Sequence, residues 1–209
     1  MSSAIDHLIV ATPGLEAGIE HLENLIGVPA IAGGSHPGMG TCNALIGLGP
    51  ECYLELIGPD PAQPDFNGTR PFGIDALEDT QLVGWAARRD GLSQFAQAQQ
   101  HLGEVIAISR ETTTGELLGW EMAFVSGAGP EAMSILPFFI DWGPTPHPAQ
   151  QCSQEAKLTR LQLQHPRPAE VLSFLSALEL DISVSTAPKP GICAFITCPK
   201  GQLRLDSKN

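Results

Sequence analysis

Residues 5–27 read IDHLIVATPGLEAGIEHLENLIG and decide the fold. The apolar run at 5–10 predicts a strand, and a helix should follow with Thr12 as its N-cap and Pro13 at its first position. Leucine and isoleucine at 15, 19, 22 and 26 follow a helical period, and Gly27 is suited to end the helix in a left-handed conformation. Further strands are expected at 30–32, 43–48 and 52–57, so the unit is β-α-β-β-β.

The same unit returns later in the chain. Leu15 and Leu92 hold equivalent places, which gives a repeat of about 77 residues. The second copy has expected strands at 82–88, 105–110, 117–125 and 135–141 and a helix over 92–102, with Asp90 as N-cap and Gly103 as its end. A third, shorter copy begins at Leu158, with a helix over 171–178 and short strands near 182, 192 and 203.

These repeats predict the domain organisation. Modules at 1–60 and 80–143 pair into one unit over 1–143, and a shortened third module at 151–209 packs on them. The Pro-rich segment 144–150 connects the two parts. Helices cover one face of such a sheet and leave the other face uncovered. Paired modules therefore predict a concave site for a small molecule on that second face.

Composition restricts the partners. The 209 residues are 43% hydrophobic and carry 23 acidic against 11 basic side chains, a net charge of −12. Such a surface repels phosphate backbones and anionic lipid, which argues against nucleic-acid and membrane partners. The N-terminus lacks the pattern of a signal peptide and no apolar run is long enough to span a bilayer, so we expect a cytoplasmic protein. Sheet edges between modules leave a homodimer open.

Several motifs suggest a family. Residues 6–8 (DHL) open the first strand and residues 53–57 (YLELI) form the last strand of the first module; more specific are 33–45 (GGSHPGMGTCNAL), 137–143 (PFFIDWG) and 146–148 (PHP). Together they resemble the glyoxalase-like domain family of the vicinal-oxygen-chelate (glyoxalase/bleomycin resistance/dioxygenase) superfamily. The resemblance implies an α+β fold in which repeated βαβββ modules form a curved mixed sheet.

The resemblance also implies a site. His7 and Glu55 match two positions that hold a divalent metal in metal-binding members, and their donors suit zinc, nickel, manganese or iron. The equivalent positions of the second module are expected to be Gly84 and Phe139, and those of the third copy lie near Arg160 and Arg204. None of these four side chains binds a metal, so a metal site and a metal-free hydrogen-bonded pair both stay open.

Other side chains complete the candidate site. His36 lies in an expected Gly-rich loop, where it would shuttle a proton, complete a metal site or only order the turn. Residues expected to line a substrate pocket are Asn43, Trp85, Arg110, Trp120 and Phe139. The alternatives are turn chemistry for Asn43, pairing with a carboxylate for Arg110, and core packing for the aromatic residues. Asp141 is more typical of a turn cap than of catalysis.

Two functions follow from this site. The first is an enzyme acting on a small oxygenated molecule, of lyase, isomerase or dioxygenase type, with Glu55 as base or metal ligand beside His7. The second is a non-catalytic protein that binds or sequesters a small ligand, as bleomycin-resistance relatives do. No GxSxG, P-loop, dinucleotide or HExxH motif is present, which argues against triad hydrolases, nucleotide-binding proteins and zincins.

Overall fold

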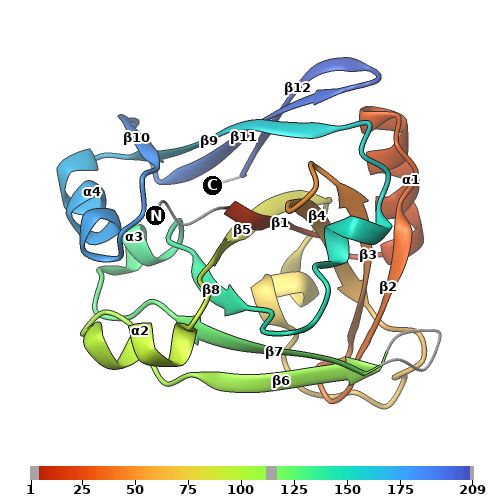
Figure 1. Cartoon of the computed structure of the whole chain (residues 1–209). Coiled ribbons are helices and arrows are strands. Elements are labelled where there is room, and N and C mark those ends of the chain that lie inside the picture. The colour runs from red at the N-terminus through yellow and green to blue at the C-terminus, as the bar shows by residue number, and fades with distance from the viewer. Residues whose placement is uncertain (1–4, 112–116, 208–209) are drawn as a thin grey trace.

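A computed structural model describes residues 5–111 and 117–207. The strands form an eight-stranded sheet in the order β2-β3-β4-β1-β5-β8-β7-β6 and a four-stranded sheet in the order β10-β9-β11-β12 (Figure 1). The larger sheet contains β1 (Ile5–Ala11), β2 (Ile31–His36), β3 (Thr41–Gly47), β4 (Tyr53–Pro59), β5 (Gln81–Arg88), β6 (Ile106–Glu111), β7 (Leu117–Phe124) and β8 (Phe138–Asp141). The smaller sheet contains β9 (Lys157–His165), β10 (Ser183–Thr186), β11 (Gly191–Cys198) and β12 (Gly201–Asp206).

Helices interrupt the strands once in each repeat. The helices are α1 (Leu15–Ile26), α2 (Leu92–Ala98), α3 (Pro130–Met133) and α4 (Pro168–Ala177), with 3-10 turns η1 (Pro71–Ala76) and η2 (Pro148–Gln151). A strand, a helix and three strands therefore follow one another three times, with α3 as an addition before β8. The α+β fold of repeated βαβββ modules, predicted from the sequence, is confirmed.

The larger sheet is mixed and strongly curled. Its two repeats meet where β1 pairs with β5 in antiparallel orientation, and each repeat contributes one parallel pair, β1 with β4 and β5 with β8. The edge strands β2 and β6 approach one another, so the sheet has an inner and an outer face. Helices α1 and α2 and the four-stranded sheet lie outside the curl (Figure 1).

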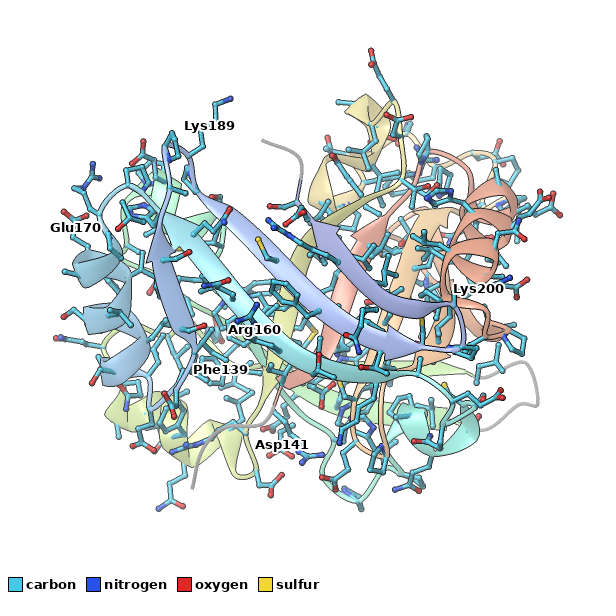
Figure 2. All side chains as sticks on the ribbon, turned by 90° about the horizontal axis from the view of Figure 1, so that it is seen from above. Phe139, Asp141, Arg160, Glu170, Lys189 and Lys200 are labelled. Atoms are coloured by element: carbon cyan, nitrogen blue, oxygen red, sulfur yellow. The ribbon has the colours of Figure 1, made fainter. Side chains whose placement is uncertain are left out.

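The two faces carry two hydrophobic clusters. On β1, Leu8 and Val10 pack into the outer cluster, whereas Ile9 and Ala11 belong to the inner one, as alternation along a strand requires. The outer cluster also takes in residues of α1, α2, α4 and the smaller sheet. Seen from above, the smaller sheet lies across the larger one (Figure 2). None of the helices within the described ranges is long and apolar enough to cross a bilayer.

Helix starts differ from the sequence prediction. Helix α1 begins at Leu15, with Gly14 as its N-cap, and the Thr12 hydroxyl accepts hydrogen bonds from the Gly14 amide at 3.4 Å and from Thr80 Oγ1 at 2.8 Å. Gly27 ends the helix with φ of 80°, as predicted. Helix α2 is preceded by Gly91 and not capped by Asp90; the distant Asp141 accepts from the amides of Gly91 and Leu92 at 2.8 and 3.2 Å. Helix α2 also stops at Ala98, before the predicted Gly103.

Candidate functional site

His7 and Glu55 face one another on the inner face of the curled sheet. In the parallel pairing of β1 with β4, Ile9 lies opposite Glu55 and His7 lies opposite Tyr53. His7 Nε2 is 3.8 Å from Glu55 Oε2, which is too long for a hydrogen bond. The His7 side chain is 3% exposed and that of Glu55 is 13% exposed. The carboxylate is therefore in partial contact with solvent, while the imidazole is buried.

Strands β2 and β3 add two of the predicted residues. Asn43 Nδ2 donates a hydrogen bond to Glu55 Oε1 at 2.5 Å, and His36 Nε2 lies 3.9 Å from the same oxygen. His36 is the last residue of β2 and not a loop residue as predicted, and its Nδ1 is 3.0 Å from Thr41 Oγ1. The structure thus brings together His7, His36, Asn43 and Glu55 from four neighbouring strands.

Trp85 and Phe139 are not brought to this site. Both belong to the outer cluster, where Phe139 is completely buried and Trp85 Nε1 donates to the Ile135 carbonyl at 2.9 Å. Ala86 of β5 pairs with Phe138, as Ile9 of β1 pairs with Glu55. Phe138 is therefore the counterpart of Glu55. Its ring lies on the inner face, 5.6 Å from the His7 ring.

The other two expected pocket residues lie on β6 and β7. Trp120 is partly exposed, packs against the inner cluster and has its ring centroid 5.4 Å from that of Trp142. Arg110 pairs with Leu118 through the backbone, but its side chain lies outside the described residues.

Asp6 is the buried centre of the site, and the sequence interpretation assigned it no role. It is completely buried, and its Oδ1 accepts a hydrogen bond from His7 Nδ1 at 2.7 Å. Its Oδ2 lies 3.0 Å from His147 Nε2 and accepts from Trp142 Nε1 at 3.1 Å. Trp142 and His147 lie in the motifs at 137–143 and 146–148, which carried the resemblance to the family but no predicted site residue. His147 stood in a segment interpreted as a connector, yet it is 7% exposed.

These contacts keep Asp6 ionised. Burial raises the pKa of its carboxyl, but the hydrogen bonds from His147 and His7, with the charges of those rings, outweigh burial and lower the pKa from 3.8 to about 2. An ionised Asp6 accepts a hydrogen bond from the Nδ1–H group of His7. A neutral His7 then has its Nε2 lone pair directed toward Glu55.

His7, His36 and Glu55 approach one another, but the described side chains do not have the arrangement of the divalent metal site that the resemblance implied. Within the described part of the chain, no three His, Cys, Asp or Glu side chains are grouped so as to hold a metal ion. The second module supplies Gly84 and Phe138 at the positions that correspond to His7 and Glu55, and neither offers a metal ligand. A catalytic metal usually takes about three protein ligands.

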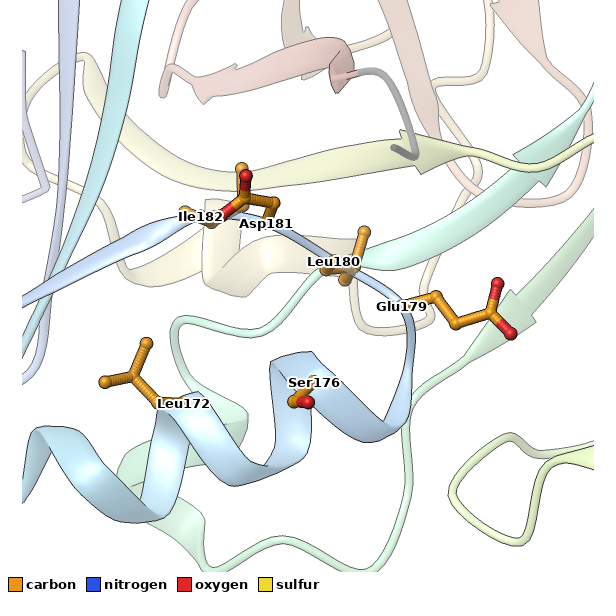
Figure 3. A pocket seen from close by; sticks show the side chains of 6 residues that line it. All are labelled: Leu172, Ser176, Glu179, Leu180, Asp181 and Ile182. Atoms are coloured by element: carbon orange, nitrogen blue, oxygen red, sulfur yellow. The ribbon is translucent and has the colours of Figure 1, made fainter. Parts of the chain in front are cut away.

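A separate pocket lies beside α4, away from these residues. It has a volume of about 480 Å³ and is open to solvent (Figure 3). Its walls come from α4 and the segment that leads to β10: Leu172, Ser176, Glu179, Leu180, Asp181 and Ile182. Glu179 is already paired with Arg89 at 2.7 Å. None of the predicted site residues lines this pocket.

The chain belongs to the glyoxalase-like domain family, because residues 5–179 match the model of that family. This confirms the resemblance drawn from the sequence motifs. The comparison with curated proteins gives no match.

A solved structure gives the same fold. A hypothetical protein from Staphylococcus aureus is similar with a TM-score of 0.68 and 15% identity, over 97% of this chain and 87% of that one. Methylmalonyl-CoA epimerase from Mycobacterium tuberculosis is similar with a TM-score of 0.47 and 17% identity, over 67% of this chain and 88% of that one. Likeness at such identities concerns the fold alone.

Proposed function

We propose that this chain is an enzyme that transfers a proton on a small oxygenated molecule, as an isomerase or a lyase does. One observation supports this most: His7 Nε2 and the Glu55 carboxylate face each other across 3.8 Å on the inner face, where Glu55 is partly exposed. Two groups that accept or return a proton lie beside one accessible position, which is the arrangement that general acid-base chemistry requires.

The surrounding contacts support separate roles for the two groups. Asp6 holds the His7 Nδ1 proton, so Nε2 is available as a base. Asn43 donates to one oxygen of Glu55 and leaves the second oxygen, which faces His7, for a substrate. Either base would take the proton of a C–H beside a carbonyl, exchange it with water and return a proton to the substrate.

The apolar side chains on the inner face of the curled sheet favour an uncharged substrate. Five apolar side chains pack against the inner cluster and are partly exposed: Ile31, Leu77, Val83, Trp120 and Met122. Among the described residues, the polar partners of Glu55 are His7, His36 and Asn43, and none is an arginine or lysine. A carboxylate without a cationic partner disfavours an anionic group beside it.

Cytoplasmic location and a homodimer stay predictions from the sequence.

Proton exchange tests the proposal without knowledge of the full reaction. Neutral hydroxyketones and 1,2-diketones, with anionic 2-oxo acids for comparison, are incubated with the protein in D2O, and NMR follows deuterium entering next to the carbonyl. We expect exchange with the neutral compounds, and a loss of about 100-fold or more in Glu55→Gln and His7→Gln, because an acid-base group contributes about 10²–10⁴-fold.

Glu170→Gln is the matched control. It removes the same charge from an exposed carboxylate on α4 that pairs with Arg167 outside the site, so exchange should be unchanged. Wild-type rates in both site variants, or no exchange with any compound, would count against the proposal.

A non-catalytic binding protein is the second candidate. The observation in its favour is that the second module places Gly84 and Phe138 where the first has His7 and Glu55. Such a protein would be stabilised against heating by neutral ligands, which mass spectrometry would recover unchanged. Detection of a product would exclude it.

A further inference from the structure

Asp6 and His7 are adjacent in the chain, yet their side chains meet. Successive residues of a regular strand point to opposite faces of the sheet. The pairing of β1 with β5 shifts register between Ile5 and His7, and this irregularity allows Asp6 Oδ1 and His7 Nδ1 to meet at 2.7 Å. The orientation of His7 therefore depends on what holds Asp6.

The second oxygen of Asp6 is held by Trp142, at the end of the second module, and by His147, in the segment that follows it. His147 precedes the η2 turn, and the Ala149 amide donates to its Nδ1 at 3.2 Å. Since Nδ1 accepts a hydrogen bond, a neutral His147 carries its proton on Nε2, which lies 3.0 Å from Asp6 Oδ2. Trp142 Nε1, a donor only, fills the same oxygen.

We propose that His147 is a positioning residue, which acts through Asp6 to hold His7 as the tautomer with a proton on Nδ1 and a free Nε2. The backbone amide of Ala149 fixes His147, His147 and Trp142 fix the Asp6 carboxylate, and the carboxylate fixes His7. The segment between the two sheets is thus part of the site. The catalytic consequence rests on the proposed function, whereas the tautomer of His7 does not.

Long-range ¹⁵N–¹H spectra of the histidine rings test the tautomer directly, without substrate. In the wild-type protein we expect His7 to be protonated on Nδ1 alone at neutral pH. In His147→Phe we expect a mixture of the two His7 tautomers and, where exchange activity is present, a loss of about 10–100-fold, as for other groups that orient a functional histidine. His147→Gln provides an amide donor to Asp6, so it should restore the wild-type spectrum and most of the activity.

Two further variants make the result decisive. His101→Gln changes a histidine that contacts Gln100 and Phe174 outside the site, and it should leave the His7 signals unchanged. Trp142→Phe removes the other donor to the same Asp6 oxygen and should also give a mixture of the two His7 tautomers. This variant provides the test if His147→Phe does not fold. An unchanged His7 tautomer in the folded variants would overturn the positioning role. A shifted tautomer without turnover of any compound would instead leave this role standing and reject the proposed function.

Discussion

Gly33 shows how closely the residues behind Glu55 are packed. A Cβ added at Gly33 would overlap the Asn43 side-chain oxygen and come within 3.2 Å of the Asn43 carbonyl oxygen. Asn43 is 7% exposed and its Oδ1 has no hydrogen-bond partner among the described residues, so its place is set by packing and by its bond to Glu55. Gly33 is therefore required for space and not for an unusual backbone angle.

Gly33→Ala should displace Asn43 and break its hydrogen bond to Glu55. We expect a loss of about 1–3 kcal/mol in the free energy of unfolding, measured by urea denaturation, because a tight contact is overfilled. Proton exchange on the neutral compounds should fall with it. Gly129→Ala is the control, since nothing lies within 4 Å of a Cβ there. Equal stability of the two variants would show that Asn43 adapts without loss.

Asp6 makes the stability of the fold depend on pH in the acid range. Its pKa is lowered from 3.8 to about 2 in the folded protein, so the ionised form stabilises the fold above pH 3.8, and this contribution is lost as pH falls toward 2. A shift of this size corresponds to about 2 kcal/mol.

Asp6→Asn should remove this part of the pH dependence. We expect the variant to be less stable than the wild type by at least about 2 kcal/mol at neutral pH, with a difference that shrinks between pH 4 and pH 2. Urea denaturation of both proteins at several pH values measures the difference in the free energy of unfolding. The contributions of the other carboxylates are common to both proteins and cancel in this difference. A constant difference across that window would contradict the role of Asp6.

Sequence reasoning found part of this site through the resemblance to the glyoxalase-like domain family. The resemblance matched His7 and Glu55 to two site positions of the first module, and their strands do pair side by side. Asp6 and His147 meet across 141 positions of chain through an irregular strand and a turn, and no periodic pattern encodes such a contact. The Pro-His-Pro motif was the available signal, since a histidine fixed between two prolines is unusual in a linker.

At the scale of elements, the end of helix α4 carries a conformational strain. Glu179 has φ of 58°, a left-handed conformation that glycine adopts more easily, directly after the last turn. The motif is otherwise regular, because Leu180 N donates to the Leu175 carbonyl at 2.8 Å. The Glu179 side chain pairs with Arg89 of the segment between β5 and α2.

Comparison of Glu179→Gly with Glu179→Ala isolates the strain. Both variants lose the ion pair with Arg89, but only alanine keeps a Cβ in the left-handed conformation. We expect the glycine variant to be more stable than the alanine variant by about 1 kcal/mol in thermal or urea denaturation. The reverse order would show that this segment does not keep its backbone conformation in solution.

Element prediction found the strands of the larger sheet but placed the start of the last strand of the second module three residues too early. Strand β8 was expected to start at 135, but residues 130–133 form α3 and the strand starts at Phe138. The expected closing strand at 135–141 then offered Phe139 as the counterpart of Glu55, whereas the strand pairing gives Phe138. A shift of one position in a strand moves a side chain to the opposite face of the sheet, so Phe139 lies in the outer core.

At the scale of the whole molecule, the two sheets share one core. The outer cluster contains Leu8, Trp85 and Phe139 of the larger sheet together with Leu163 and Ile196 of the smaller one. The repeat pattern predicted three modules in sequence. It carried no information on which face of the larger sheet the third module covers.

A shared core predicts that damage to the smaller sheet unfolds the larger one. Leu163 of β9 is completely buried, and Leu163→Ala should lower the free energy of unfolding by about 2–5 kcal/mol. The three tryptophans, at positions 85, 120 and 142, all lie outside the smaller sheet, so their fluorescence reports on the rest of the molecule. We expect fluorescence and far-UV circular dichroism to show the same lowered urea midpoint, as one cooperative unit requires.

Leu172→Ala is the control for this experiment, because it makes the same change on α4 at a side chain that is 44% exposed. It should alter stability by no more than about 0.5 kcal/mol. If Leu163→Ala left the tryptophan transition at its wild-type midpoint while circular dichroism showed a separate early loss, the two sheets would unfold independently. The packing between the sheets would then not stabilise the curled sheet, and the His7–Glu55 site would not depend on the C-terminal module.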